Sequence, residues 1–319
     1  MNKLFARKNG GENPLPDPVP ADQQAYITLL DDDPSFALTV QPPPAGHSAA
    51  GCTTCPSHNA AQLQRLGINM ENWDYVVALA GNPNVGKSTV FNALTGLRQH
   101  TGNWPGKTVT RAEGGFEYGG SRYKLVDLPG TYSLLATSLD EEVARDFILF
   151  GQPDVTIVVA DATRLERNLN LVLQVLEITD RVVVCLNLMD EARRHGLLVD
   201  ERRLARDLGV PVVPTEARQR KGLSELLQAI DDVASGRTVT KPHRIKSEPP
   251  ALKRAVNQLA TQLERAFPGL PNARWVALRL LDGDPRIVEA VQRGELGELG
   301  GAGNGLLQPA EPRLELAGA

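Results

Sequence analysis

The chain has 319 residues, 41% hydrophobic and 23% charged, which suffices for one α/β domain and a smaller companion. Its net charge of −4 gives no electrostatic reason to bind nucleic acid, and three cysteines cannot build a disulfide framework, which favours a reducing cytoplasmic setting. No apolar run approaches the roughly 20 residues of a membrane-spanning helix, and no secretory signal opens the chain, so we expect these residues to be soluble.

Residues 1–70 are expected to form a largely disordered extension, because PLPDPVP and QPPPAG contribute few apolar positions that could be buried. The segment holds H-x4-C-x2-C-x2-H, formed by His47, Cys52, Cys55 and His58. Thiolate and imidazole groups at this spacing suit Zn²⁺ or iron. The alternative, which we favour, is a linker with incidental ligands, because the loops are short and disorder flanks them.

From Trp73 onward the chain alternates between strand and helix patterns. The apolar runs are continuous rather than alternating, as in strands that helices cover on both faces. We therefore predict a doubly wound, mostly parallel sheet in a domain spanning 71–236. Strands are expected at 75–80, 123–126, 155–160, 181–186 and 210–213, and helices at 87–95, 141–150, 165–178, 199–208 and 223–234.

Residues 237–295 are expected to comprise a linker and a small all-helical domain. Leu252, Val256, Leu259 and Leu263 are spaced for one face of a helix that ends before Pro268. Two shorter helices are expected at 273–281 and 285–292. The last segment, 296–319, is rich in glycine and proline and is predicted to be a flexible tail.

The strongest motif is G-N-P-N-V-G-K-S at 81–88, which fits G-x-x-x-x-G-K-[ST] between a predicted strand and a predicted helix. Its glycines let backbone N–H groups and a helix N-terminus face phosphate oxygens. Lys87 would reach the β- and γ-phosphates, and the Ser88 hydroxyl would coordinate Mg²⁺. The predicted nucleotide-binding residues here are Gly81, Asn82, Pro83, Asn84, Val85, Gly86, Lys87, Ser88 and Thr89.

Further motifs distinguish a GTPase from other phosphate-loop proteins. The D-x-x-G of Asp127 and Gly130 follows a predicted strand; the acid would hold Mg²⁺ through water, and the glycine amide would bond the γ-phosphate. The N-x-x-D of Asn187 and Asp190 follows another, and a carboxylate can accept from both N1–H and N2–H of guanine. A fourth element lies at Thr215 to Ala217, where the Ala217 amide would bond the guanine oxygen. Together these motifs favour GTP over ATP as the ligand.

Between the phosphate loop and D-x-x-G lies T-G-N-W-P-G-K-T-V at 101–109. G-N-W-P-G-x-T-V at this place resembles the first switch of the FeoB family of bacterial ferrous iron transporters. The segments DLPGTYSL, EEVARDFIL and VVADATRLERNLNL are similar to the same family. The resemblance covers residues 74–295, including the helical region that acts in that family as a guanine-nucleotide dissociation inhibitor.

The resemblance implies roles for individual residues. Thr108 would complete the Mg²⁺ shell when the first switch closes. Asn84, with backbone carbonyls near Gly102 and Trp104, would hold a K⁺ ion whose charge replaces that of an arginine finger. Thr131 stands where some GTPases have a water-orienting glutamine, so we hypothesise slow intrinsic hydrolysis.

The resemblance also implies a setting at the cytoplasmic face of the bacterial inner membrane. The expected partners are a membrane transport domain of the same system, small accessory iron-transport proteins and further copies of this chain. Two departures from the family are evident: Glu216 stands where serine is usual, and the iron-permeating domain lies outside these residues.

Other conspicuous side chains are interpreted as structural. Cys185 lies inside an apolar strand, and Phe267 and Trp275 fit helix packing in the second domain. A basic stretch is interpreted as a solvated helix face and consists of Arg193, Arg194, Arg202, Arg203 and Arg206.

These observations predict a Ras-like P-loop GTPase followed by a helical domain. Positioning and charge stabilisation would hydrolyse GTP to GDP and phosphate, and switch movements would gate a membrane pore. The alternatives are a soluble GTPase of ribosome assembly or tRNA modification, a nucleotide sensor with negligible hydrolysis, and a protein centred on the Cys/His segment. The expected catalytic residues are Lys87, Ser88, Thr108, Asp127 and Gly130.

Overall fold

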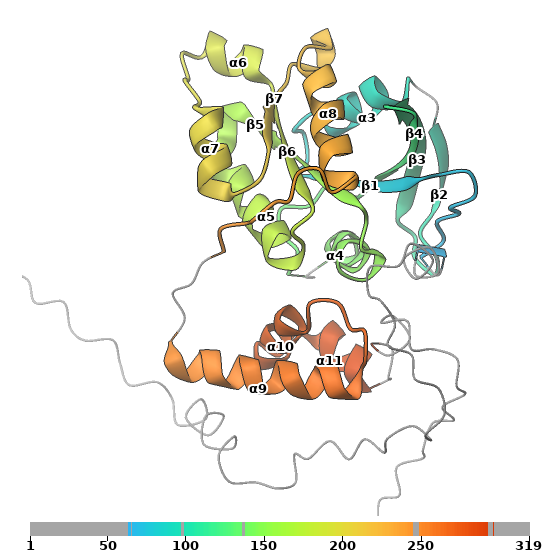
Figure 1. The fold of residues 1–319 in the computed structure, drawn as a ribbon, viewed down its shortest axis with the longest axis vertical. Helices are drawn as coiled ribbons and strands as arrows, with labels where there is room; N and C mark the ends of the chain where they lie inside the picture. The colour runs from blue at the N-terminus through green and yellow to red at the C-terminus, as the bar shows by residue number, and fades with distance from the viewer. Residues whose placement is uncertain are drawn as a thin grey trace, which may run out of the picture. The chain divides into compact units, whose positions relative to one another are not determined.

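The structure is a computed structural model, and it describes residues 63–64, 66–96, 99–135, 138–244, 249–292 and 296. Within these residues the chain forms an α/β domain followed by three helices (Figure 1). The strands are β1 (Tyr75–Gly81), β2 (Gln99–Asn103), β3 (Thr110–Tyr118), β4 (Ser121–Asp127), β5 (Val155–Asp161), β6 (Val182–Asn187) and β7 (Val212–Pro214). The helices are α3 (Lys87–Thr95), α4 (Leu139–Gly151), α5 (Leu165–Ile178), α6 (Met189–Arg194), α7 (Glu201–Leu208), α8 (Leu223–Ala234), α9 (Pro250–Ala266), α10 (Ala273–Leu281) and α11 (Pro285–Gln292), with short 3₁₀ turns η2 (Ala162–Arg164) and η3 (Ala217–Gln219).

The seven strands form one sheet in the order β2-β3-β4-β1-β5-β6-β7. Strands β4, β1, β5, β6 and β7 are parallel to one another, whereas β3 runs antiparallel to both of its neighbours, β2 and β4. The chain passes to opposite sides of β1, so the strand order reverses there. In sheets of this kind ligands bind beyond the carboxyl ends of the strands at such a point. The phosphate loop follows β1 and therefore occupies this position.

Helices cover both faces of the sheet, which confirms the predicted doubly wound architecture. One face buries apolar residues of β1 and β5 against α4 and α5, including Val76, Phe147 and Val172. The opposite face buries the alternate residues of the same strands against α3 and α8, including Leu79 and Phe91. Because both faces are buried, the parallel strands are apolar at nearly every position.

Sequence reasoning missed the β2–β3 hairpin and shifted several boundaries. β2 reads QHTGN and β3 reads TRAEGGFEY, and neither has the apolar character of the other strands. Helix α7 begins at Glu201, two residues later than predicted, because the Asp200 side chain caps it by accepting from the Arg203 N–H at 2.9 Å. β7 begins at Val212 rather than at residue 210.

The helical segment after the α/β domain packs through most of the apolar positions predicted from its sequence, but Leu252 of α9 is 37% exposed, so the prediction that it belongs to the buried face was wrong. Val256 and Leu263 of α9, Val276 of α10 and Ile287 of α11 are at most 1% exposed. Trp275 is also buried, as expected, and Phe267 is partly buried beside this cluster. None of the described helices combines the length and the hydropathy that crossing a bilayer requires.

Candidate nucleotide site

The phosphate loop owes its shape to two glycines and to left-handed backbone conformations at Asn84 and Gly86. Asn84 has φ 66° and Gly86 has φ 83°. A Cβ on Gly86 would lie 2.5 Å from Asn187 Nδ2, and one on Gly81 would lie 2.8 Å from the Val159 carbonyl oxygen. Both positions therefore require glycine for close approach, and Gly86 also requires it for its backbone angle.

Helix α3 begins at Lys87 directly after this loop, and its N-terminus is free to face an anion. No side chain caps it, and its first turn carries no acidic residue. Ser88 and Thr89 are exposed at this end of the helix. Backbone N–H groups and the helix dipole therefore favour a phosphate here, as the sequence predicted.

Lys87 and Asp127, which lie 40 positions apart in sequence, form an ion pair at 2.5 Å between Nζ and Oδ1. Burial raises the pKa of the Asp127 carboxyl, although the neighbouring ammonium of Lys87 opposes this shift. A carboxylate and the Ser88 hydroxyl are hard oxygen donors of the kind that Mg²⁺ prefers, so the residues present fit that ion.

The segment after β4 is bonded to the end of β1. The Leu128 N–H donates to the Leu79 carbonyl at 3.0 Å, and the Thr131 N–H donates to the Gly81 carbonyl at 3.3 Å. Gly130 lies against Pro83, since a Cβ built on it would be 3.5 Å from the Pro83 Cα. The predicted phosphate-sensing glycine is thus adjacent to the phosphate loop.

Asn187 joins the loops of the site through three hydrogen bonds and is only 1% exposed. Its Nδ2 donates to the Val85 carbonyl at 3.0 Å. Its Oδ1 accepts from the Ala217 N–H at 3.1 Å and from the Thr215 hydroxyl at 3.3 Å. The phosphate loop and the segment after β7 are therefore tied to the same side chain at the end of β6.

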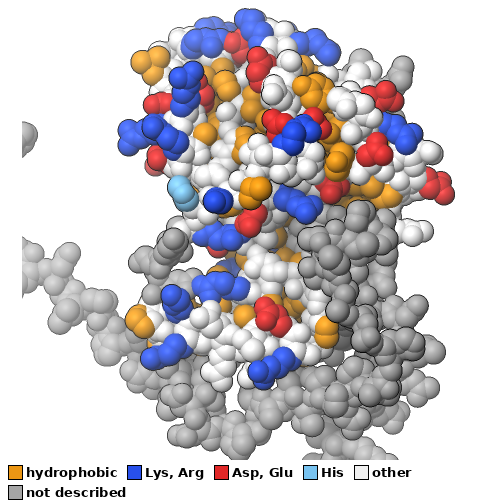
Figure 2. Space-filling view, in the orientation of Figure 1, with side chains coloured by type: hydrophobic (Ala, Val, Ile, Leu, Met, Phe, Trp, Pro, Cys, Tyr) orange, Lys and Arg blue, Asp and Glu red, His pale blue; other side chains and the backbone are white. Residues whose placement is uncertain are grey.

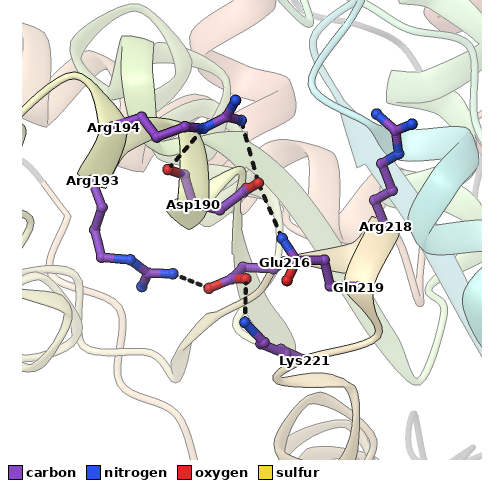
Figure 3. A pocket seen from close by; sticks show the side chains of 7 residues that line it. All are labelled: Asp190, Arg193, Arg194, Glu216, Arg218, Gln219 and Lys221. Atoms are coloured by element: carbon purple, nitrogen blue, oxygen red, sulfur yellow. Dashed lines mark hydrogen bonds and ion pairs between the residues drawn. The ribbon is translucent and has the colours of Figure 1, made fainter.

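Asp190, on α6, lines an open depression of about 750 Å³ (Figure 3). Its Oδ2 accepts from Arg194 Nη2 and from Gln219 Nε2, both at 3.4 Å. Glu216 lies across the depression and accepts from Arg193 and, at 3.0 Å, from Lys221. Hydrogen bonds from these two cationic groups lower the pKa of the Glu216 carboxyl, so it is ionised at neutral pH.

The segment that resembles a first switch packs against α4. Trp104 is buried, with its ring edge-on to Phe147 at a centroid distance of 5.3 Å, and its carbonyl accepts from the Lys107 N–H at 3.0 Å. The Lys107 ammonium pairs with Glu142 at 3.0 Å. Thr108 is exposed. Gly102 belongs to β2, and no hydrogen bond between described residues joins this segment to the phosphate loop.

The structure thus brings Lys87, Ser88, Asp127, Gly130 and Asn187 to one edge of the sheet. No hydrogen bond between described residues joins Gly102, Trp104 or Thr108 to Asn84, and K⁺ binding by Asn84 with the Gly102 and Trp104 carbonyls stays a prediction. The candidate metal ligands Cys52, Cys55 and His58, with His47, lie outside the described residues. Within the described part of the chain, no group of three or more His, Cys, Asp or Glu side chains could hold a metal ion.

Sequence reasoning missed the ionic contacts around residues 215–221, the segment after β7 that we call the base loop. Figure 2 shows basic side chains over α6 and α7 with acidic ones interspersed, which agrees with a solvated face for most of the basic stretch. Arg193 is the exception, since it reaches Glu216 from a different element. No local pattern indicates this pair, because its two members are 23 residues apart.

Comparisons with known proteins agree over both parts of the chain. Residues 75–230 match the family described as "Ferrous iron transport protein B", and residues 249–303 match "FeoB cytosolic helical domain". The Fe(2+) transporter FeoB of Salmonella typhimurium is 43% identical over 212 residues, which is 65% of this chain and 27% of that protein. The chain therefore spans about a quarter of the length of the curated relatives that it matches.

Two solved structures are similar over most of their length. The cytosolic domain of L. pneumophila FeoB is 37% identical with a TM-score of 0.63, covering 70% of this chain and 88% of that one. The cytosolic domain of the T. maritima FeoB iron transporter in its GMPPNP form is 38% identical with a TM-score of 0.62, covering 74% and 88%.

Proposed function

The chain belongs to the FeoB family of ferrous iron transport proteins, and we propose that it binds GTP and hydrolyses it to GDP and phosphate. The observation that carries the proposal is Asn187, which lies three residues before Asp190 and whose side-chain amide links the phosphate loop to the base loop. Relatives of this chain have been solved in forms named for GDP and GMPPNP, which supports a guanine nucleotide as the ligand.

Guanine would be selected at the carboxyl end of β6. The Asp190 carboxylate would accept from N1–H and N2–H of the base, in exchange for its long contacts with Arg194 and Gln219. The Ala217 N–H would bond the guanine oxygen, which requires it to share or leave its present acceptor on Asn187. Adenine lacks both donors, so ATP would be rejected at this point.

Phosphate binding would use the ion pair between Lys87 and Asp127. The Lys87 ammonium would turn from the carboxylate toward the β- and γ-phosphates, where it stabilises negative charge. This leaves Asp127 and the Ser88 hydroxyl as the groups that would hold Mg²⁺, which supplies further charge neutralisation when bound. Gly130 would donate its N–H to the γ-phosphate, so that loss of this group releases the segment after β4.

The first switch is expected to leave α4 when GTP binds. Thr108 would then reach the metal, and Asn84 with the Gly102 and Trp104 carbonyls would be the ligands of K⁺. The side chain of Thr131, which is 4% exposed, is too short and too buried to orient a water molecule as glutamine does. We therefore expect slow hydrolysis that K⁺ accelerates.

The output of the cycle would be regulation of iron transport by a membrane domain outside this chain. One contact supports a path from the switch toward the helical segment. Glu142 of α4 accepts both from Lys107 of the first switch, at 3.0 Å, and from Arg286 of α11, at 2.9 Å. A movement of Lys107 away from α4 would therefore break one ion pair of Glu142, whose carboxylate also binds Arg286 of the helical segment.

The test is GTP hydrolysis by the purified chain at fixed Mg²⁺, in K⁺ and in Na⁺, with ATP and the Lys87→Ala variant as controls. We expect GTP turnover that K⁺ stimulates and that the variant loses. Hydrolysis that is equal in both cations would contradict the K⁺ assignment alone. Equal turnover of ATP, or none of GTP in either cation, would overturn the proposed activity.

A further inference from the structure

Two ion pairs hold the base loop in place, and both are made by the carboxylate of Glu216, which is nearly buried. The Glu216 side chain is 7% exposed, yet both of its oxygens are occupied. Arg193 donates to Oε1 and Lys221 donates to Oε2. Figure 3 shows that the two cations approach the carboxylate from different elements, Arg193 from α6 and Lys221 from the segment before α8.

The backbone of Glu216 is fixed as firmly as its side chain. Its N–H donates to the Lys221 carbonyl at 3.1 Å, and its carbonyl accepts from the Gln219 N–H at 2.8 Å. The residues on either side, Thr215 and Ala217, both bond Asn187 Oδ1. Glu216 therefore has little freedom to move without moving the Ala217 amide.

Arg193 connects this loop to the other half of the base site. It lies three residues after Asp190 on α6, so the two side chains project from adjacent turns of one short helix. The Met189 N–H at the start of α6 donates to the Thr215 carbonyl at 3.3 Å, and Gln219 Nε2 donates to Asp190 Oδ2 at 3.4 Å. The Arg193–Glu216 ion pair adds an ionic link between the helix that carries Asp190 and the loop that carries Ala217.

From this arrangement we propose that Glu216 is a positioning residue for guanine recognition. Held by Arg193 and Lys221, it fixes the separation of the Asp190 carboxylate and the Ala217 amide, and thereby sets guanine selectivity and the rate of nucleotide release. The inference rests on the proposed guanine site and names the group that regulates it.

The environment of these ion pairs predicts how release depends on salt. Arg193 and Lys221 are 56% and 63% exposed, so dissolved ions can screen their attraction to Glu216. As ionic strength rises, the ion pairs of Glu216 with Arg193 and Lys221 weaken, and nucleotide release should accelerate. A residue that served only to pack the loop would give no such dependence.

The experiment measures the rate at which a fluorescent GDP dissociates from the chain at salt concentrations between about 50 and 500 mM. Over this range the Debye length falls about threefold. Glu216→Gln and Arg193→Gln should each release GDP about three- to tenfold faster at low salt, the range of a lost charge-assisted hydrogen bond that is partly exposed. Both variants should also lose most of the salt dependence. Glu264→Gln, a carboxylate-to-amide change on exposed α9, is the matched control and should behave as the unaltered chain.

Two further measurements, nucleotide preference and a charge-exchange double variant, distinguish a positioning role of Glu216 from a role in folding alone. Inosine diphosphate lacks the 2-amino group that Asp190 would bind, so the preference for GDP over it should shrink in Glu216→Gln. Exchanging the charges in Arg193→Glu with Glu216→Arg should restore part of the slow release that either single change removes. Variants with unchanged release, unchanged salt dependence and unchanged preference would overturn the inference while GDP binding stands. Absence of GDP binding by the unaltered chain would instead overturn the proposed function and this inference with it.

Discussion

Replacement of Asn187 by alanine should loosen the whole site, because one buried side chain holds three groups of it. The change leaves the Val85 carbonyl and the Ala217 N–H without their partner in a region that is nearly inaccessible to water. Each buried unpaired group costs about 1–3 kcal/mol. Thr215 retains a contact with the Leu186 carbonyl at 3.4 Å, so it adds little. For these two groups together we expect a loss of about 2–6 kcal/mol in the free energy of unfolding.

The assay is urea unfolding of the nucleotide-free chain, followed by titration of the folded variant with GDP. Asn168→Ala is the matched control, since Asn168 is also buried but makes one hydrogen bond, to the Arg164 carbonyl at 2.8 Å. That variant should lose about 1 kcal/mol and keep its GDP affinity. If Asn187→Ala were no less stable than Asn168→Ala, or bound GDP as tightly as the unaltered chain, the linking role of Asn187 would be refuted.

Three further changes test other parts of the structure. Gly86→Ala forces a left-handed backbone angle on alanine, at about 1–2 kcal/mol, and places a methyl group against the Asn187 amide, so GDP titration should show binding weakened more than about tenfold. Asp284→Ala leaves the fully buried Arg145 with one carboxylate fewer, and urea unfolding should reveal a loss of about 3 kcal/mol. Burial alone would raise the pKa of Glu142, but its two basic partners hold that pKa below its usual 4.5. Its stabilising contribution is therefore present above pH 4.5 and lost as the pH falls below that value, and Glu142→Gln should flatten this part of the acid dependence of unfolding.

The parallel part of the fold was predictable because burial on both faces leaves a continuous apolar signal. β1, β5 and β6 are apolar almost throughout, and the helices between them have regular apolar spacing. The β2–β3 hairpin gives no such signal. β3 contains two consecutive glycines, and its Gly115 lies where a Cβ would meet the Trp73 ring at 2.0 Å. That strand is held by pairing with β4 and by tertiary contacts, which a local pattern does not reveal.

The candidate site was predictable where loop chemistry dictates the residue type. A glycine is required at 86 by backbone angle and by the nearness of Asn187, and both residues are recognisable from sequence. The ion pairs of Glu216 were not predictable in the same way. The sequence shows glutamate at position 216, where serine is usual in the family. It does not show that Glu216 forms ion pairs with Arg193 of α6 and with Lys221 at the end of the base loop.

Of the three alternative functions drawn from the sequence, one disagrees with the family matches and two need an experiment. A ribosome-assembly or tRNA-modifying GTPase does not account for the match of residues 249–303 to the FeoB cytosolic helical domain. A sensor with negligible hydrolysis differs from the proposed function only in rate, which single-turnover kinetics would measure. The Cys/His hypothesis concerns residues outside those described, and metal analysis of the purified chain would test it.

Guanine selection at the carboxyl end of β6 is the central claim, and equilibrium binding tests it most directly. Calorimetric titration of the chain with GDP and ADP should give tight binding of GDP and none of ADP under the same conditions. In Asp190→Asn, GDP binding should fall and xanthosine diphosphate, whose base presents an oxygen in place of the 2-amino group, should bind instead. Equal binding of GDP and ADP by the unaltered chain, or unchanged GDP binding by Asp190→Asn, would contradict the account.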